Sequence, residues 1–263
     1  MNSFANSNWY DLQLRLMSAS FLLVASVFCI YFGSYLFTFF IISLIGVMHW
    51  ELGKMLSPLS AQAMWFSALL AIIATFFLLK SDNFVWPMIV LFFNFYFQRI
   101  FFHHNRNFGA FYSLAVIICG VIFYKIRLNF GLYHTFWLIG IVVVTDTAGY
   151  LIGRIIGGPK VFPRISPKKT WAGVLAGWFA VGLFSWLFVE NIAPQNLFIK
   201  FVSISIILSV SAQVGDMIQS NLKRRSDVKD SSGLIPGHGG FMDRFDGFVG
   251  ATVVTGLFFE WVY

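Results

Sequence analysis

Charged residues are scarce in this 263-residue chain: Asp, Glu, Lys and Arg together make up only 11% of it, against roughly 25% in soluble domains. Hydrophobic residues make up 58%, and Phe alone occurs 33 times. This composition lies far outside the range of soluble globular domains. It predicts an integral membrane protein, in which the bilayer sets the architecture.

Cysteine is equally scarce, which excludes two classes of structure. Cys29 and Cys119 both lie inside apolar runs, so neither a disulfide framework nor a cysteine metal cluster is expected. No A-x-A-like cleavage site follows the first apolar segment, and Phe28 before Cys29 does not fit a lipoprotein processing site. We therefore expect this segment to be retained as a membrane helix.

Apolar runs of membrane-spanning length recur along the chain. About 20 apolar residues cross the hydrocarbon core as a helix, and unpaired backbone cannot lie in lipid. By this measure the sequence predicts nine spans, near 14–31, 34–50, 59–79, 83–102, 108–124, 132–152, 172–189, 198–219 and 246–262. The predicted fold class is therefore an all-α integral membrane protein with about nine transmembrane helices.

Lys and Arg are distributed unevenly between the two sides of this topology. One side would carry only four of the 18 basic residues, namely Lys80, Lys125, Arg127 and Lys200. Because basic residues concentrate in cytoplasmic loops, the N-terminus is expected in the cytoplasm and the C-terminus outside. The net charge of +7 thus follows membrane topology and does not indicate nucleic-acid binding. We expect the protein in the cell inner (plasma) membrane.

The chain is predicted to divide into two regions. Residues 1–131 would form about five spans without a recognisable motif, and residues 132–263 would form a catalytic region with two cytoplasmic basic loops. Gly149, Gly153 and Gly157 recur every fourth residue in this second region and predict close helix–helix packing. In the first region, His49 and Glu51 end the second span and are expected to be structural, and the pair His103–His104 is expected to lie at the membrane interface.

Four aspartates lie within or beside the predicted spans of the second region. Asp146 is inside the sixth span, Asp216 lies near the cytoplasmic end of the eighth, and Asp246 opens the ninth, three residues after Asp243. Ionisable groups in spans are functional candidates because burying them is costly. Carboxylates suit hard cations, and Mg²⁺ usually takes few carboxylates plus substrate phosphates. The four aspartates therefore predict a metal site that an anionic ligand completes.

Basic residues in both cytoplasmic loops, 153–173 and 220–240, adjoin the spans that carry these aspartates. They are mixed with Gly, Pro and Ser, as in phosphate-binding loops. The candidate phosphate-binding residues are Lys168, Lys169, Ser220, Lys223, Arg224, Lys229 and His238. His238 could instead simply hold a turn, and Arg244 could pair with a neighbouring aspartate. Basic loops beside an acidic metal cluster suit phosphoryl transfer.

The segment 220–246 resembles the signature of the phosphatidate cytidylyltransferase family, also called CDP-diacylglycerol synthases. The matching residues are Ser220, Lys223, Arg224, Lys229, Asp230, Pro236, His238, Gly239, Gly240, Asp243, Arg244 and Asp246. A second stretch is also similar to the family, at Asp146, Tyr150, Gly153, Arg154 and 166–170. The resemblance covers roughly the C-terminal half of the chain.

This resemblance implies transfer of CMP from CTP to phosphatidic acid, giving CDP-diacylglycerol and pyrophosphate. It also implies dependence on Mg²⁺ and a homodimer, and a second cation could bind beside the first. We expect Asp216, Asp243 and Asp246 to hold the catalytic metal, with Asp146 as a further ligand or close partner. Lys223 and Arg224 would act on the phosphates during catalysis, at a site that faces the cytoplasm. The expected partners are CTP, phosphatidic acid and membrane lipids.

Two other functions fit part of the pattern. A CTP-dependent transferase acting on another lipid, such as a polyprenol kinase or an archaeal-lipid cytidylyltransferase, could use similar residues, since the motif does not show headgroup specificity. A cation transporter could use Asp146 and Asp216. It would gain little from two basic loops beside its carboxylates and would place acidic residues nearer the middle of the bilayer.

Overall fold

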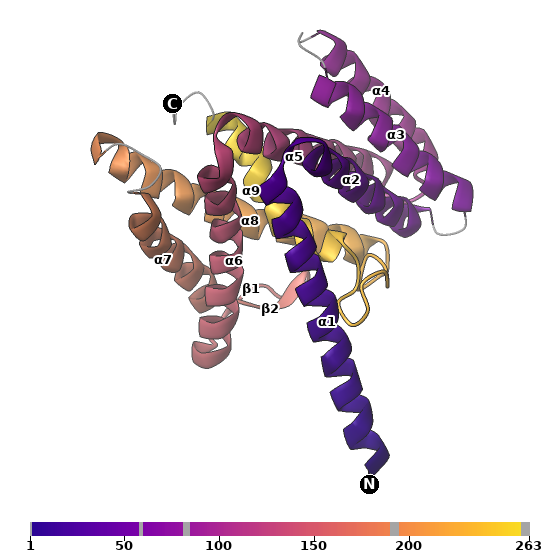
Figure 1. Cartoon of the computed structure of the whole chain (residues 1–263). Coiled ribbons are helices and arrows are strands. Elements are labelled where there is room, and N and C mark those ends of the chain that lie inside the picture. Colours follow the sequence, from indigo (N-terminus) through magenta and orange to yellow (C-terminus); the bar gives the residue numbers. More distant parts are fainter. Residues whose placement is uncertain (1, 58–59, 81–84, 190–194, 259–263) are drawn as a thin grey trace. The chain divides into compact units, whose positions relative to one another are not determined.

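The computed structural model describes residues 2–57, 60–80, 85–189 and 195–258. These residues contain nine α-helices and one two-stranded sheet (Figure 1). The helices are α1 (Asn2–Phe32), α2 (Ser34–Leu56), α3 (Ala61–Lys80), α4 (Val85–Phe101), α5 (Arg106–Asn129), α6 (Gly131–Ile156), α7 (Trp171–Phe188), α8 (Phe198–Arg225) and α9 (Met242–Thr255). The predominantly helical fold predicted from the sequence is confirmed.

Six of the described helices are long and apolar enough to cross a membrane: α2, α3, α5, α6, α7 and α8. Two apolar helical stretches are shorter, Met17–Phe32 within α1 and the whole of α4. Helix α9 has only 14 residues, and the last residues of the predicted ninth span, 259–262, lie outside the described residues. A multi-pass membrane protein is therefore supported, and the number of nine spans stays a prediction.

Helix α8 is longer than the eighth predicted span, which ends at 219. Ser220, Lys223 and Arg224, predicted to lie in a loop, are instead on the last turns of this helix. Lys and Arg are good helix formers and are favourable near a helix C-terminus. With 28 residues and a rise of about 1.5 Å per residue, α8 exceeds the hydrocarbon thickness of about 30 Å. Its last turns can therefore carry charge outside the lipid.

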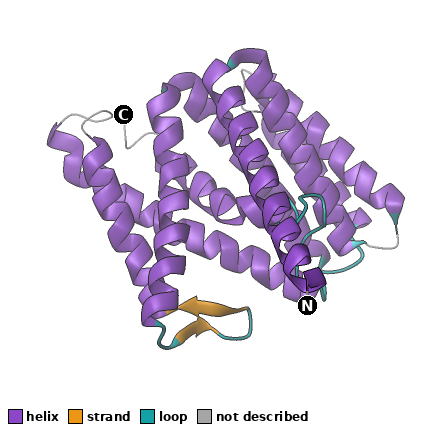
Figure 2. Ribbon diagram, turned by 60° about the horizontal axis from the view of Figure 1, so that its bottom comes forward, coloured by secondary structure: helices purple, strands orange, loops and turns teal. Residues whose placement is uncertain are grey.

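The first basic loop contains a β-hairpin that the sequence analysis did not predict. Strand β1 (Lys160–Phe162) pairs antiparallel with β2 (Ser166–Thr170), as Figure 2 shows in orange. Pro159, Pro163 and Pro167 exclude a helix across this segment, because proline lacks the N–H that a helix interior requires. The hairpin gives the loop a fixed shape between α6 and α7.

The chain forms two compact units. Unit 1 comprises Met1–Gly120 and Arg225–Arg244, and unit 2 comprises Val121–Arg224 and Phe245–Tyr263. The boundary near the C-terminus falls within the first turn of α9. These units are defined by packing, and unit 1 combines the early helices with residues 225–244. The functional division into residues 1–131 and 132–263 is a different one and stays a prediction.

In unit 1, α2 packs along α3, and α3 lies beside α4 (Figure 1). A Cβ atom on Gly53 would lie 2.8 Å from the Cα of Met64 on α3, so only glycine permits this approach. His49 is fully buried, and its ring nitrogens lie 2.8 Å from the Ile45 carbonyl oxygen and 2.9 Å from Ser113 Oγ. These contacts confirm the predicted structural role of His49.

In unit 2, α6 and α7 pack closely through glycines. A Cβ atom on Gly149 would lie 3.3 Å from the carbonyl oxygen of Gly173 on α7, and one on Gly153 would lie 3.4 Å from its Cα. The predicted packing role is confirmed for these two residues and is wrong for Gly157. Gly157 instead ends α6 with φ +68° and has open space around it, since glycine adopts the left-handed conformation readily.

Candidate functional site

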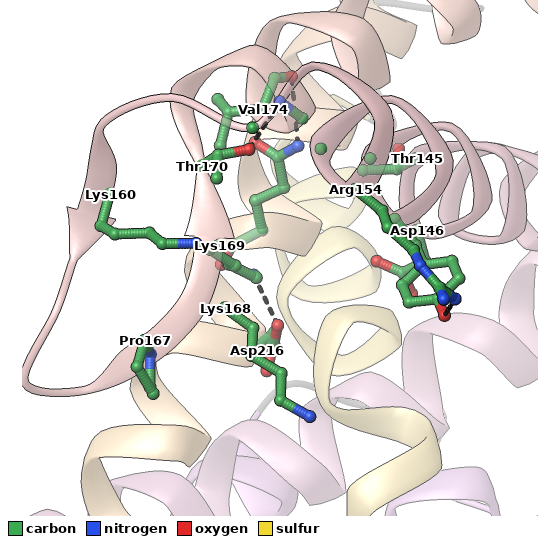
Figure 3. A pocket seen from close by; sticks show the side chains of 16 residues that line it. Thr145, Asp146, Arg154, Lys160, Pro167, Lys168, Lys169, Thr170, Val174 and Asp216 are labelled. Carbon is green, nitrogen blue, oxygen red and sulfur yellow. Dashed lines mark hydrogen bonds and ion pairs between the residues drawn. The ribbon is translucent and has the colours of Figure 1, made fainter.

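A cavity of about 740 Å³ in unit 2 lies between α6, the hairpin, α7 and α8. Its charged lining residues, shown in Figure 3, are Asp146, Arg154, Lys160, Lys168, Lys169 and Asp216. The cavity thus brings together two of the four aspartates predicted for a metal and both lysines predicted in the first basic loop. Lys160 and Arg154 were not predicted as phosphate ligands, although Arg154 belongs to the stretch that resembles the family.

One face of α6 supplies three polar groups to the cavity. Asp146, Tyr150 and Arg154 follow one another at intervals of four residues and therefore lie on one side of the helix. The Arg154 guanidinium donates a hydrogen bond to the Tyr150 hydroxyl at 3.0 Å. Gly149 and Gly153 lie next to this polar face, so the contact that packs α6 on α7 also holds the three side chains toward the cavity.

Lys169 connects the hairpin with α8. Its Nζ lies 2.5 Å from Asp216 Oδ2 (Figure 3), and the two side chains are about a quarter exposed. The same ammonium group donates to the carbonyl oxygen of Gln213 at 3.4 Å. The Gln213 side chain in turn accepts from Trp178 Nε1 at 2.9 Å and donates to the Val174 carbonyl at 3.3 Å, which ties α8 to α7. This network fixes the position of Lys169 over the carboxylate.

The end of α8 presents a second polar face. Ser220 lies one turn after Asp216, and its hydroxyl donates to Asp216 Oδ1 at 3.2 Å. Lys223 lies one turn further, is 8% exposed, and interacts electrostatically with Asp216 and Asp246. The structure therefore brings together Ser220, Lys223 and the carboxylates. Arg224 is exposed at the end of the helix and does not line the cavity.

The carboxylates of unit 2 are close together. Asp216 interacts electrostatically with Asp146, and its carboxyl group lies within hydrogen-bonding reach of that of Asp246. Asp246 Oδ1 also accepts a hydrogen bond from the backbone N–H of Gly247 at 2.7 Å. Uncompensated carboxylates at this spacing repel each other, so positive charge from Lys169, Lys223 or a bound cation is needed to hold them together.

Two glycines explain why α8 and α9 approach closely enough to pair Asp216 with Asp246. A Cβ atom on Gly215 would lie 2.7 Å from the carbonyl oxygen of Asp246 and 2.8 Å from the Cα of Gly250. Both neighbours are backbone atoms and cannot turn away as a side chain would. The glycine before Asp216 is therefore part of what positions the site.

Replacing Gly215 with Ala is expected to push α9 away from α8 and to lower turnover about 100-fold, because small displacements of catalytic groups have large effects on rate. Gly182→Ala is the matched control, because a Cβ atom there would meet only Ile206 carbons at 3.7 Å or more. Its activity should stay near that of the unchanged protein. Equal turnover of the two variants would show that this close approach does not position the carboxylates.

The cavity of unit 2 offers carboxylate oxygens to a metal ion, but the described residues do not supply a complete set of protein ligands. Among the described residues, no group of three or more His, Cys, Asp or Glu side chains is arranged to hold a metal ion. Mg²⁺ needs only one or two carboxylates when substrate phosphates and water complete its coordination. The pair Asp216 and Asp246, with Asp146 beside it, fits that second arrangement.

In unit 1, Glu51 on α2 binds the segment that resembles the family signature. The carboxylate is fully buried. Its Oε1 accepts from the Ser232 hydroxyl at 2.5 Å and from the Phe241 N–H at 2.9 Å. Its Oε2 accepts from the Met242 N–H at 2.7 Å and from the Ser231 hydroxyl at 3.2 Å. The structural role predicted for Glu51 is therefore specific: it fixes this loop and the start of α9.

Asp243 is bonded within the same loop. Its Oδ2 accepts from the Ser231 N–H at 2.8 Å, from the Ser231 hydroxyl at 3.0 Å and from the Gly240 N–H at 3.0 Å. These bonds give Asp243 a role in folding the loop. Its predicted role as a metal ligand stays a prediction, since Asp243 belongs to unit 1 and Asp216 and Asp246 to unit 2.

His238 and Arg244 contribute to the same loop. The Arg244 guanidinium donates to the carbonyl oxygen of His238, with Nη2 at 2.6 Å and Nε at 3.1 Å. The His238 ring Nδ1 lies 3.1 Å from Ser18 Oγ. His238 thus holds the turn, one of the two roles considered from the sequence, and its role toward phosphate stays a prediction. Lys229 lies exposed in this loop.

Comparison with protein families matches residues 13–262 to the model of the Cytidylyltransferase family. The chain belongs to this family. Among curated relatives, it is similar to phosphatidate cytidylyltransferases of Brucella suis (40% identical over 131 residues), Bacillus subtilis (38% over 146) and Staphylococcus aureus (39% over 140). These matches cover 49%, 53% and 52% of the chain and 47%, 54% and 53% of the relatives. The chain thus spans about half the length of the curated relatives it matches.

Membership of the Cytidylyltransferase family confirms the resemblance seen in the motifs. It also extends beyond them, because the match begins at residue 13, whereas the recognised motifs begin at Asp146. The early helices, which show no motif, therefore belong to the family as well. Two residues of these helices contact the motif segment directly: Ser18 on α1, through Pro236 and His238, and Glu51 on α2, through four hydrogen bonds. The sequence did contain a signal for Glu51, since it is the one acidic residue of α2–α5, and buried charge in spans is usually functional.

Proposed function

We propose that the protein is a phosphatidate cytidylyltransferase, which transfers CMP from CTP to phosphatidic acid and releases pyrophosphate. The observation that carries this proposal is the cavity of unit 2, where lysines from the hairpin face Asp146 and Asp216, with Asp246 beside them. Family membership and the names of the curated relatives support it. Such a cavity offers positive charge to phosphates and negative charge to a cation.

In the proposed reaction, a phosphate oxygen of phosphatidic acid attacks the α-phosphorus of CTP. A new P–O bond forms, the bond from the α-phosphorus to the bridging oxygen breaks, and pyrophosphate leaves with that oxygen. Asp216 and Asp246, with Asp146, would hold Mg²⁺, which neutralises charge on the reacting phosphates when bound. The chain itself contributes mainly orientation and electrostatics.

Each basic residue would bind the phosphates that its position in the structure allows it to reach. Lys168 and Lys169 on the hairpin, with Lys223 at the end of α8, would bind phosphate oxygens at the cavity. Arg224 and Lys229, both exposed, would contact the outer phosphates of CTP. Ser220 and His238 would donate hydrogen bonds, and Asp243 would serve as a further metal ligand while folding its loop. Lys169 is paired with Asp216 in this structure. With a cation bound to Asp216, the Lys169 ammonium group would instead bind a phosphate oxygen.

Lys169→Gln is expected to raise the KM for CTP and to lower kcat, so that kcat/KM falls about 100-fold. The reason is that the site loses both the charge that pairs with Asp216 and a positive group that binds phosphate. Lys200→Gln, which removes the same charge at the other end of α8, is the control. Steady-state kinetics with varied CTP would measure both parameters. Unchanged kinetics of the Lys169 variant would remove the hairpin from the proposed site.

The reactants require a site at the membrane surface. Each CH₂ group moved from lipid to water costs about 0.8 kcal/mol, so the acyl chains of phosphatidic acid stay in the bilayer, while CTP stays in water. We propose nine spans with the N-terminus and the active site on the cytoplasmic side of the inner membrane and the C-terminus outside. The support is the concentration of Lys and Arg in the loops that carry the site. The proposed homodimer rests on the family resemblance alone.

Pyrophosphate release tests the proposal. The purified full-length chain in detergent would be assayed with CTP, Mg²⁺ and phosphatidic acid, and each would be omitted in turn. Release that requires all three, with a CDP-lipid product, is the expected result. Release without phosphatidic acid, or none while cation flux is measurable in vesicles, would overturn it in favour of another reaction or a transporter.

A further inference from the structure

A second cavity lies entirely in unit 1, at the ends of three segments. It has a volume of about 610 Å³ and is formed by the end of α4, the start of α5 and Arg225. It shares no lining residue with the cavity of unit 2. Nothing in the motifs or in the proposed reaction uses it, so its chemistry must be judged from its own residues.

Three arginines define the charge of this cavity. Arg99 comes from α4, Arg106 from the first turn of α5, and Arg225 is the last residue of α8, and all three are exposed. No acidic residue is among the described residues that line it. Guanidinium groups brought together repel each other, and their fixed planar donors suit two oxygens of one phosphate. The cavity therefore favours an anion with several oxygens.

Contacts with neighbouring side chains hold Arg225 in a fixed position at the cavity. The Asn105 side-chain amide donates to the carbonyl oxygen of Arg225 at 3.1 Å. Asn105 itself has φ +48°, a conformation that asparagine tolerates better than most residues. The Arg225 guanidinium lies over the Phe108 ring, 5.5 Å from its centroid, which is a favourable cation–π contact. The turn before α5 thus holds Arg225 beside the other two arginines.

The surroundings of the cavity are apolar on one side. Tyr96 and Ile100 on α4 line it, and Phe92, Phe93 and Phe97 on the same helix are exposed. Exposed aromatic residues on a membrane helix face lipid, and Tyr is common at the interface with water. A phospholipid whose phosphate binds the arginines could therefore place its acyl chains along α4, whereas a free phosphate ion would leave this apolar surface uncovered.

We propose that this cavity binds the phosphate headgroup of an anionic membrane phospholipid, at a site separate from the catalytic cavity. Attraction of basic residues to an anionic leaflet is general, at about 1 kcal/mol per residue, but it does not require guanidinium geometry. The proposal does: arginines at fixed positions bind the phosphate, and α4 receives the chains. Binding of this lipid does not depend on the catalytic reaction.

Native mass spectrometry of the full-length chain in detergent tests this proposal. The protein would be offered equal amounts of dioleoyl phosphatidylglycerol and dioleoyl phosphatidylcholine, and retained lipid would be counted. Preferential retention of phosphatidylglycerol is expected, and the double variant Arg99→Gln/Arg106→Gln should reduce this preference at least about tenfold, as expected for loss of charged hydrogen bonds. Lys80→Gln/Lys125→Gln, with the same change in net charge, should retain it.

Two further arms separate a built site from general attraction. Arg99→Lys/Arg106→Lys keeps the charge but loses the planar donors, so it should also lose most of the preference. If the Arg99→Lys/Arg106→Lys variant retained as much phosphatidylglycerol as the unchanged protein, charge alone would attract the lipid, and the proposal would be overturned. Displacement of phosphatidylglycerol by inorganic phosphate at equal concentration would overturn it too, because the ligand would then be a free anion.

Discussion

Asp216→Asn is expected to lower turnover by roughly 1,000-fold while the protein still folds and inserts. Asn keeps the size of the side chain but removes the charge that pairs with Lys169 at 2.5 Å and interacts with Asp146 and Asp246. With the carboxylate gone, a cation at this point would lose a ligand, and Lys169 would lose the contact that positions it. Initial rates at saturating CTP and Mg²⁺ would measure the effect.

Asp227→Asn is the matched control for this prediction. It makes the same chemical change at an exposed position with φ +55°, which asparagine adopts readily, so activity should be kept. The double variant Asp216→Asn/Asp246→Asn should be little worse than the single one, because residues that hold one ion act as a unit. Near-normal turnover of Asp216→Asn would show that this carboxylate does not hold the catalytic cation.

Glu51→Gln is expected to loosen the signature loop and to lower turnover about 100-fold, although Glu51 is assigned no contact with substrate. Gln keeps the shape but replaces one acceptor oxygen with a donor NH₂ group, which would face the N–H or O–H donors of Ser231, Ser232, Phe241 and Met242. Hydrogen bonds to charged groups contribute about 1.5–3 kcal/mol each. Loss of two of them would therefore open the loop far more often.

Limited proteolysis measures this opening independently of activity. Trypsin can cut after Arg225 and Lys229, and cleavage should become about 100-fold faster in Glu51→Gln if the loop opens locally. Ser232→Ala removes only one of the four donors and should give a smaller effect, about tenfold or less. A Glu51→Gln protein with an intact loop and full turnover would contradict the assigned role.

The sequence alone was most informative where a charge had to be explained. Asp146, Asp216 and Asp246 stood out because membrane helices rarely carry carboxylates, and the structure brings these three together in unit 2. Lys168 and Lys169 were identified because their basic loop adjoins spans that carry these aspartates, and both line the cavity. The predominantly helical fold followed from apolar runs of the length that a bilayer requires.

Other features depended on contacts that no local pattern contains. Glu51 meets its partners across 180 to 191 residues of sequence, so its capping of α9 could not be seen from the residues around it. The hairpin pairs Lys160 with Thr170 in a segment read as a plain loop, because prolines within a short run argue against a strand. The spacing of Gly157 matched a packing motif, yet its position at the end of α6 made it a cap.

Transfer of radioactive phosphate from CTP to lipid tests the central claim most directly. The purified protein would be given phosphatidic acid, Mg²⁺ and CTP labelled either at the α- or at the γ-phosphate, and the lipid fraction would be counted. Cytidylyl transfer predicts that the α-label enters the lipid and that the γ-label leaves in pyrophosphate. Entry of the γ-label into lipid would mean that the enzyme is a kinase and would contradict the assignment of this cavity to CMP transfer.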